Sequence, residues 1–84
     1  MAIKVTRFII VDGDGDIWSR GMGCWIDAFT FQVMAVGANP KVFKTWYTDK
    51  AEAEKDCAEL NAANPHAECE IKMLDLNLPK EENE

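Results

Sequence analysis

The residues that could do chemistry begin with Asp12, Asp14 and Asp16, which are separated by single glycines. Alternating carboxylates are the ligands at positions 1, 3 and 5 of a calcium-binding loop. Such a loop needs glycine at position 6 and a bidentate glutamate at position 12, where this chain has Ile17 and Gly23. The pattern therefore favours a hairpin turn with solvated aspartates over a metal site, and we predict no metal and no cofactor.

Cysteine and histidine residues could form a zinc site or a nucleophilic pair. Cys24, Cys57 and Cys69 are odd in number and lack the C-x₂₋₄-C spacing of structural zinc sites. Cys57 and Cys69 fall on apolar positions, as small buried side chains do, and His66 follows Asn64-Pro65 as an exposed turn residue. A Cys–His pair stays open as an alternative, but no recognisable motif supplies the third, orienting group. We predict no catalytic residues, so the chain is not expected to be an enzyme.

Aromatic side chains are abundant for a chain of 84 residues, with four Phe, three Trp and one Tyr. One helix packed on one sheet can bury only some of these eight rings. Exposed Trp and Tyr side chains are typical anchors of protein interfaces. Burial under the segment 22–36 is the equal alternative. The aromatic residues that we predict to form a protein-binding surface are Trp18, Trp25, Trp46 and Tyr47.

Acidic residues outnumber basic ones by fifteen to nine, which gives a net charge of −6. This charge repels nucleic acid and anionic membranes, so neither is expected as a direct partner. Glu52, Asp56 and Glu59 follow i, i+4, i+7 spacing and share one helix face, although Lys55 lies among them. Their arrangement predicts a face that binds a basic protein, while solubility alone is the alternative explanation.

The elements that position these residues follow from short-range patterns. Residues 3–11 and 16–19 predict a β-hairpin around the Asp-Gly turn, and Asp49 with Glu52 predicts a capped helix that ends near Asn61. Residues 67–73 alternate with period two and predict a strand. Two further segments have β-branched and aromatic character. Residues 25–36 are predicted as a strand, with a helix carrying Trp25, Phe29, Val33 and Val36 as the alternative, and residues 42–47 are predicted as a strand or an edge segment.

Length and composition limit the architecture to one small domain. We predict an α+β fold over residues 1–75, with an antiparallel sheet of three or four strands and one helix packed on one face, followed by a disordered acidic tail at 76–84. The N-terminus has no apolar segment of a secretory signal, and no apolar run is long enough to span a bilayer. A cytoplasmic protein is expected.

A family resemblance rests on residues 41–45, which read KVFKT, and residues 48–55, which read TDKAEAEK. With the preceding Asp-Gly hairpin and its Trp, and a final strand, they resemble small phage and mobile-element proteins of uncharacterised role. The likeness fails across residues 22–39, where this chain is longer. Some phage proteins of this size inhibit CRISPR–Cas systems, so the resemblance implies an inhibitor of a host nucleic-acid enzyme that acts in the host cytoplasm.

Together these observations predict a non-catalytic protein-binding module, with a homodimer through the same aromatic face as a companion property. The partner expected from the charge is a basic nucleic-acid-binding protein. The alternatives are a phage structural or assembly protein and a small thiol or hydrolytic enzyme.

Overall fold

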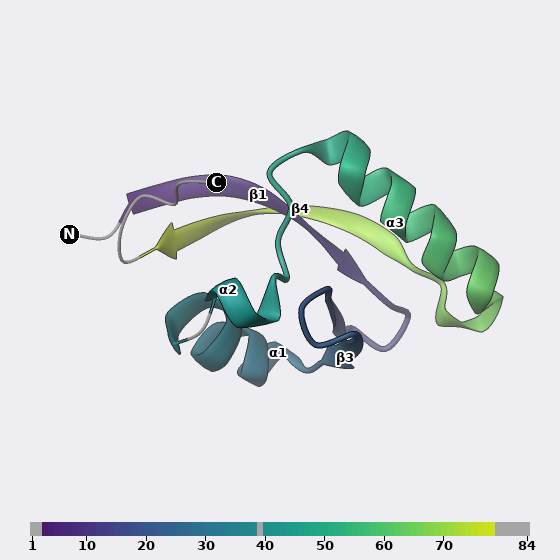
Figure 1. The fold of residues 1–84 in the computed structure, drawn as a ribbon, viewed down its shortest axis with the longest axis horizontal. Coiled ribbons are helices and arrows are strands. Elements are labelled where there is room, and N and C mark those ends of the chain that lie inside the picture. The colour runs from purple at the N-terminus through teal and green to yellow at the C-terminus, as the bar shows by residue number, and fades with distance from the viewer. Residues whose placement is uncertain (1–2, 39, 79–84) are drawn as a thin grey trace.

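The structure is a computed structural model that describes residues 3–38 and 40–78. Its four strands form one antiparallel sheet in the order β3-β2-β1-β4, with helices between β3 and β4 (Figure 1). The predicted α+β class and antiparallel sheet are confirmed. The strands are β1 (Ile3–Val11), β2 (Ile17–Ser19), β3 (Cys24–Ile26) and β4 (Glu70–Leu78). The helical elements are α1 (Ala28–Thr30), the π-helix η1 (Phe31–Ala38), α2 (Pro40–Phe43), α3 (Lys50–Ala63) and the 3-10 helix η2 (Pro65–Ala67).

The β1–β2 hairpin is built by its aspartate turn, as predicted. Asp12 Oδ1 accepts hydrogen bonds from the backbone N–H groups of Asp14 at 3.0 Å and Asp16 at 2.9 Å. Gly15 has a φ of +88°, a conformation that glycine adopts at little cost. Val11 then pairs with Ile17 as the first residue pair of the hairpin. One carboxylate oxygen of Asp12 is therefore used to hold the turn.

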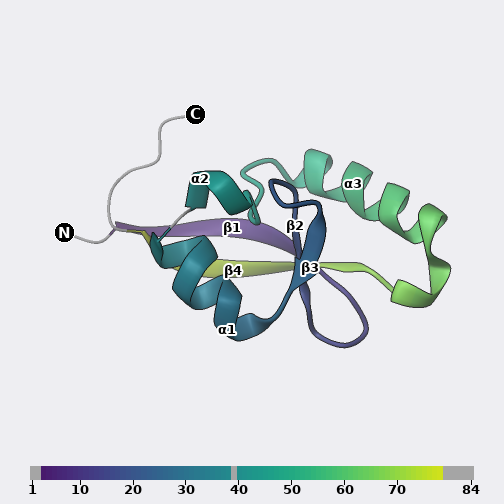
Figure 2. The same cartoon turned by 60° about the horizontal axis from the view of Figure 1, so that its bottom comes forward.

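Helical elements cover both faces of the sheet, whereas a single covered face was predicted. Neighbouring residues of a strand point to opposite faces. On β1, Ile10 packs in a cluster with Ala53 and Cys57 of α3, while Ile9 packs in a second cluster with Phe31 of η1. The two views agree that α3 and the α1–η1 segment lie on opposite sides of the long β1–β4 ribbon (Figures 1 and 2).

The main helix α3 follows its sequence signals. Asp49 is the N-cap residue, and its carboxylate accepts a 2.9 Å hydrogen bond from the backbone N–H of Ala51. Cys57 is buried, as predicted, and so is Ala53, which lies four residues earlier on the same helix face. The helix continues to Ala63, slightly beyond the predicted end.

The predicted strand at 25–36 is wrong beyond Ile26. Asp27 caps a helix instead, because its carboxylate accepts a 2.7 Å hydrogen bond from the N–H of Thr30. The alternative, a helix, is correct from Ala28 onward, but the side of this helix that was expected to be buried is wrong. Phe29 was expected to face inward and is 75% exposed, whereas Phe31 is buried. The reason is tertiary: Phe31 packs on the sheet face that carries Ile9, which fixes the side of the helix that points inward.

The prediction of a strand or edge segment at 42–47 holds only at Tyr47. The first residues of this segment belong to α2, and Lys44 has a φ of +46°, which interrupts an extended conformation. Only Tyr47 pairs with the sheet, through two backbone hydrogen bonds with Phe8 of 3.0 and 2.7 Å. β2 is too short to cover the edge of β1 at Phe8, and Tyr47 fills this remaining position.

The final strand is displaced along the chain relative to its prediction. Ala67 belongs to η2, and β4 begins at Glu70 and pairs with all of β1, up to Leu78 opposite Ile3. The predicted start of the tail at residue 76 therefore falls inside a strand, where Leu76 is buried. The remaining predicted tail, 79–84, lies outside the described residues. Within the described ranges, no helix has the length and apolarity to cross a bilayer.

Candidate functional site

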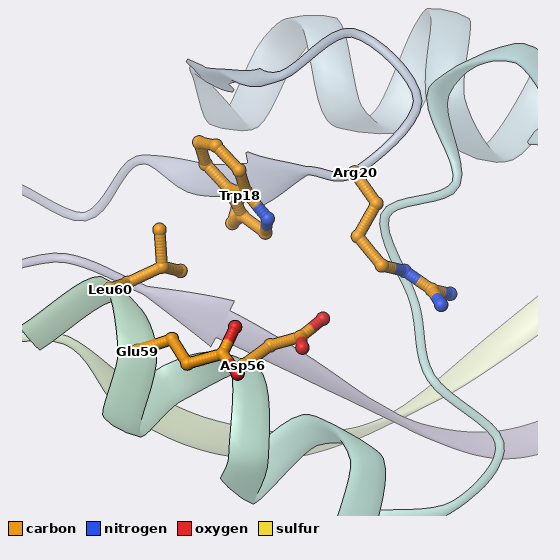
Figure 3. A pocket seen from close by; sticks show the side chains of 5 residues that line it. All are labelled: Trp18, Arg20, Asp56, Glu59 and Leu60. Atoms are coloured by element: carbon orange, nitrogen blue, oxygen red, sulfur yellow. The ribbon is translucent and has the colours of Figure 1, made fainter. Parts of the chain in front are cut away.

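A pocket of about 270 Å³ lies where α3 passes the β2–β3 hairpin. One wall is the indole of Trp18 from β2, and the opposite wall comes from Asp56, Glu59 and Leu60 of α3, with Arg20 at one end (Figure 3). Three of these residues, Trp18, Asp56 and Glu59, were predicted as binding residues from the sequence. The tertiary structure brings them together from two elements that are far apart in the chain.

Arg20 belongs to the turn between β2 and β3, and its side chain binds the loop before α3. Its Nε donates a 3.2 Å hydrogen bond to the Lys44 carbonyl, and Nη2 donates a 2.6 Å bond to the Trp46 carbonyl. The guanidinium carbon also lies 3.9 Å from the ring centre of Tyr47, a cation–π arrangement. Arg20 therefore fixes the loop, and two of its nitrogens are already occupied by protein carbonyls.

Tyr47, whose ring lies against the Arg20 guanidinium, also contacts α3. Its hydroxyl donates a 2.6 Å hydrogen bond to Asp56 Oδ2. Burial raises the pKa of Tyr47 well above its usual range, and the hydrogen bond and negative charge of Asp56 raise it further. The phenol consequently stays protonated at neutral pH and holds the Asp56 carboxylate at the rim of the pocket.

The acidic face of α3, defined here as Glu52, Asp56 and Glu59, has the predicted geometry. Asp56 and Glu59 line the pocket, and Glu52 Oε2 lies 4.0 Å from Arg20 Nη1. Arg20 thus borders a group of three carboxylates. Glu68 and Glu70 line a separate pocket beside the Asp12–Asp16 turn and do not contribute to this one.

The predicted aromatic surface is only partly realised. Trp18 and Trp25 are half-buried and pack edge to face, with ring centres 5.3 Å apart. Trp46 is 5% exposed and Tyr47 is 1% exposed, so the prediction that they form a contact surface is wrong. Trp46 belongs to the cluster around Ile9, and Tyr47 lies beneath the Arg20 guanidinium.

Sequence reasoning missed Arg20 and the position of Leu60 beside Trp18. The carbonyls that bind Arg20 are 24 and 26 residues away in the chain. No periodicity or capping rule connects residues at such separations, and a single arginine in a glycine-rich turn is no signal by itself. Leu60 is apolar, but no pattern in the sequence indicates that it lies beside Trp18.

The groups considered for catalysis or metal binding lie elsewhere. Cys57 and Cys69 are buried, and burial raises the pKa of both thiols, which disfavours the reactive thiolate. His66 is exposed on η2. Within the described part of the chain, no three His, Cys, Asp or Glu side chains are grouped so that they could hold a metal ion.

Comparisons with protein-family models, with curated proteins and with solved structures find no match to this chain. The function is therefore argued from the geometry and charge of the pocket and of the acidic face beside it.

Proposed function

We propose that this protein is a non-catalytic binding module that recognises a basic protein partner through the acidic face of α3 and the adjoining Trp18. The supporting observation is the pocket, in which Asp56 and Glu59 lie across from a half-buried indole. Interfaces combine such aromatic anchors with charged rims. Both components are present here on one side of the molecule.

The charge arrangement supports a role beyond solubility. Carboxylates at i, i+4 spacing on a helix repel each other by a few tenths of a kcal/mol. Glu52, Asp56 and Glu59 are nevertheless placed together, and the Tyr47 hydroxyl holds one of them in position. A basic partner would relieve this repulsion and would be steered toward the face by the net charge of −6.

A nucleic-acid enzyme is the partner class that best matches this charge, because its substrate groove is basic. An acidic module in that groove competes with nucleic acid and inhibits the enzyme. The sequence resemblance to small phage proteins adds the more specific proposal of a phage-encoded inhibitor of a CRISPR nuclease in the host cytoplasm.

The test uses the full chain to capture its partner from cells that express it, followed by binding kinetics with the purified pair. We expect the triple variant E52K/D56K/E59K to slow association more than it speeds dissociation, with the larger effect at low salt. The matched control, D14K/E54K/E68K, changes the net charge equally at exposed positions away from the pocket. Equal effects of the two variants would show that only overall charge matters and would overturn the proposal.

A second candidate, self-association as in an assembly protein, has a separate observation in its favour. Phe29 is 75% exposed and Val33, four residues later, is 47% exposed. Exposed apolar side chains grouped on one segment are typical of contact sites. A dimer that is detected by sedimentation and abolished by Phe29→Ser would support this function, whereas a monomer across the accessible concentration range would exclude it.

A further inference from the structure

We infer that the pocket between Trp18 and α3 is a receptor for one arginine side chain of the partner. This inference rests on the proposed function and specifies which group of the partner enters the site. The pocket has a volume of about 270 Å³, near the lower end of the roughly 300–1,000 Å³ typical of small-molecule pockets, so its occupant is small, on the scale of one side chain.

The chemistry of the walls identifies a cation. Asp56 and Glu59 supply carboxylates on one side, Trp18 supplies an aromatic surface on the other, and Leu60 adds an apolar contact (Figure 3). Tryptophan is the best aromatic partner for a cation, and its π-surface attracts positive charge. An extended side chain with a terminal charge can use the apolar and the acidic parts at once.

Arg20 does not take the place of the occupant, and its positive charge is outweighed by the neighbouring carboxylates. Its hydrogen bonds to the Lys44 and Trp46 carbonyls and its position over Tyr47 hold the guanidinium at the far end of the pocket. With Glu52 at 4.0 Å, the three carboxylates and one guanidinium leave a net negative charge of two around the site.

Arginine fits better than lysine for two physical reasons. A planar guanidinium stacks on an indole and donates paired hydrogen bonds to carboxylates, whereas an ammonium is a strongly hydrated point charge. The Tyr47 hydroxyl holds the Asp56 carboxylate in place through Oδ2, and Oδ1 together with the Glu59 carboxylate can accept the bonds of a guanidinium.

The experiment is an NMR titration of the full isotope-labelled chain with the peptide acetyl-Gly-Arg-Gly-amide. We expect the indole N–H signal of Trp18 to shift, with a dissociation constant in roughly the millimolar range for so small a ligand. The same peptide with lysine should bind at least about threefold more weakly, and with neutral citrulline it should produce no shift. Equal responses to the arginine and citrulline peptides, or to arginine and lysine, would overturn the inference.

Two isosteric variants locate the site without disturbing the fold. Glu59 and Glu54 are both exposed on α3, but only Glu59 lines the pocket. Glu59→Gln should weaken binding of the arginine peptide by roughly threefold or more, while Glu54→Gln should leave it unchanged. Equal weakening by both variants would mean attraction to the helix as a whole and would overturn the inference.

The outcome separates this inference from the proposed function. If E52K/D56K/E59K abolishes partner binding while the peptide leaves Trp18 unshifted, the acidic face is a binding surface and the arginine pocket is wrong. If the peptide binds as expected but the triple variant binds the partner normally, the pocket accepts arginine and the proposal that the acidic face of α3 binds the partner is wrong.

Discussion

The Tyr47 hydroxyl donates a 2.6 Å hydrogen bond to Asp56 Oδ2 and thereby joins a core residue to a carboxylate of the acidic face. Tyr47 is itself fixed by its backbone pairing with Phe8 of β1 and by the Arg20 guanidinium above its ring. The position of one pocket carboxylate is consequently set by the sheet. Substitutions that move Tyr47 in the core should therefore also move the Asp56 carboxylate in the pocket.

Removal of this hydroxyl tests the connection directly. Tyr47→Phe keeps the ring under Arg20 but deletes the hydrogen bond to Asp56. We expect the free energy of unfolding to fall by about 1–2 kcal/mol, since bonds to charged groups contribute at the upper end of the usual range. Urea denaturation followed by tryptophan fluorescence measures the change, and an unaltered midpoint would show that this bond adds nothing to stability.

Alkaline pH should destabilise the fold through the same residue. The folded-state pKa of Tyr47 is raised above its ordinary value of 10.0, so unfolding releases a proton once the pH exceeds that value. The stabilising contribution is complete below pH 10.0 and is lost as the pH rises through the folded pKa, by at most about 1.4 kcal/mol per pH unit.

The chain contains a single tyrosine, so its ionisation can be followed by ultraviolet difference absorbance. Denaturation curves at several alkaline pH values should show a steeper loss of stability for the wild type than for Tyr47→Phe. Cys57 and Cys69 have pKa values raised by burial above 9.0 and add a loss common to both proteins. Parallel curves for the two proteins would contradict the assignment to Tyr47.

Gly21 lies where the β2–β3 turn meets α2. Its backbone N–H donates a 2.9 Å hydrogen bond to the Phe43 carbonyl, and a Cβ atom at Gly21 would overlap the Val42 carbonyl oxygen. Because the obstacle is backbone, it cannot rotate away, and we expect Gly21→Ala to lower the free energy of unfolding by more than about 2 kcal/mol.

Gly13→Ala is the matched control for this substitution. A Cβ atom there would meet the end of the Glu68 side chain at 3.2 Å, and that carboxylate can move. Thermal unfolding should thus give a small effect at position 13 and a large one at position 21. Similar losses at both glycines would show that the close approach of Gly21 to the Val42 carbonyl does not determine the cost.

Asn61 joins the end of α3 to the beginning of β4. Its Oδ1 accepts a 2.7 Å hydrogen bond from the Cys69 N–H, and its Nδ2 donates a 3.0 Å bond to the Cys69 carbonyl. Asn61→Ala leaves both backbone groups of a buried residue without this partner, so we expect a loss of about 2–3 kcal/mol.

Asn64→Ala serves as the comparison, because Asn64 is exposed at the same helix end and its side chain makes no capping hydrogen bond. Chemical denaturation should show a small effect at Asn64 and a clear one at Asn61. Hydrogen exchange of the Cys69 amide should also accelerate in Asn61→Ala only. An unchanged exchange rate would mean that this amide is protected by burial alone.

The sequence by itself determined the features that depend on near neighbours. The Asp12 turn, the Asp49 cap and the acidic face of α3 each involve residues within a few positions of one another, where hydrogen-bond rules and helical periodicity apply directly. The apolar positions assigned to Cys57 and Cys69 likewise identified part of the core. These local signals were sufficient for the α+β class and for the acidic half of the site.

Only the tertiary structure decided the conformation and burial of residues whose local sequence has a weak or conflicting preference for helix or strand. Val42 and Phe43 have β-propensity but form α2, and the neighbouring Tyr47 became a buried bridge residue because β2 leaves the edge of β1 open at Phe8. Arg20 became part of the site through carbonyls 24 and 26 residues away. Burial and long-range pairing contribute more free energy than the few tenths of a kcal/mol of intrinsic propensity, so the final arrangement of the whole chain determined which aromatic rings reached the surface.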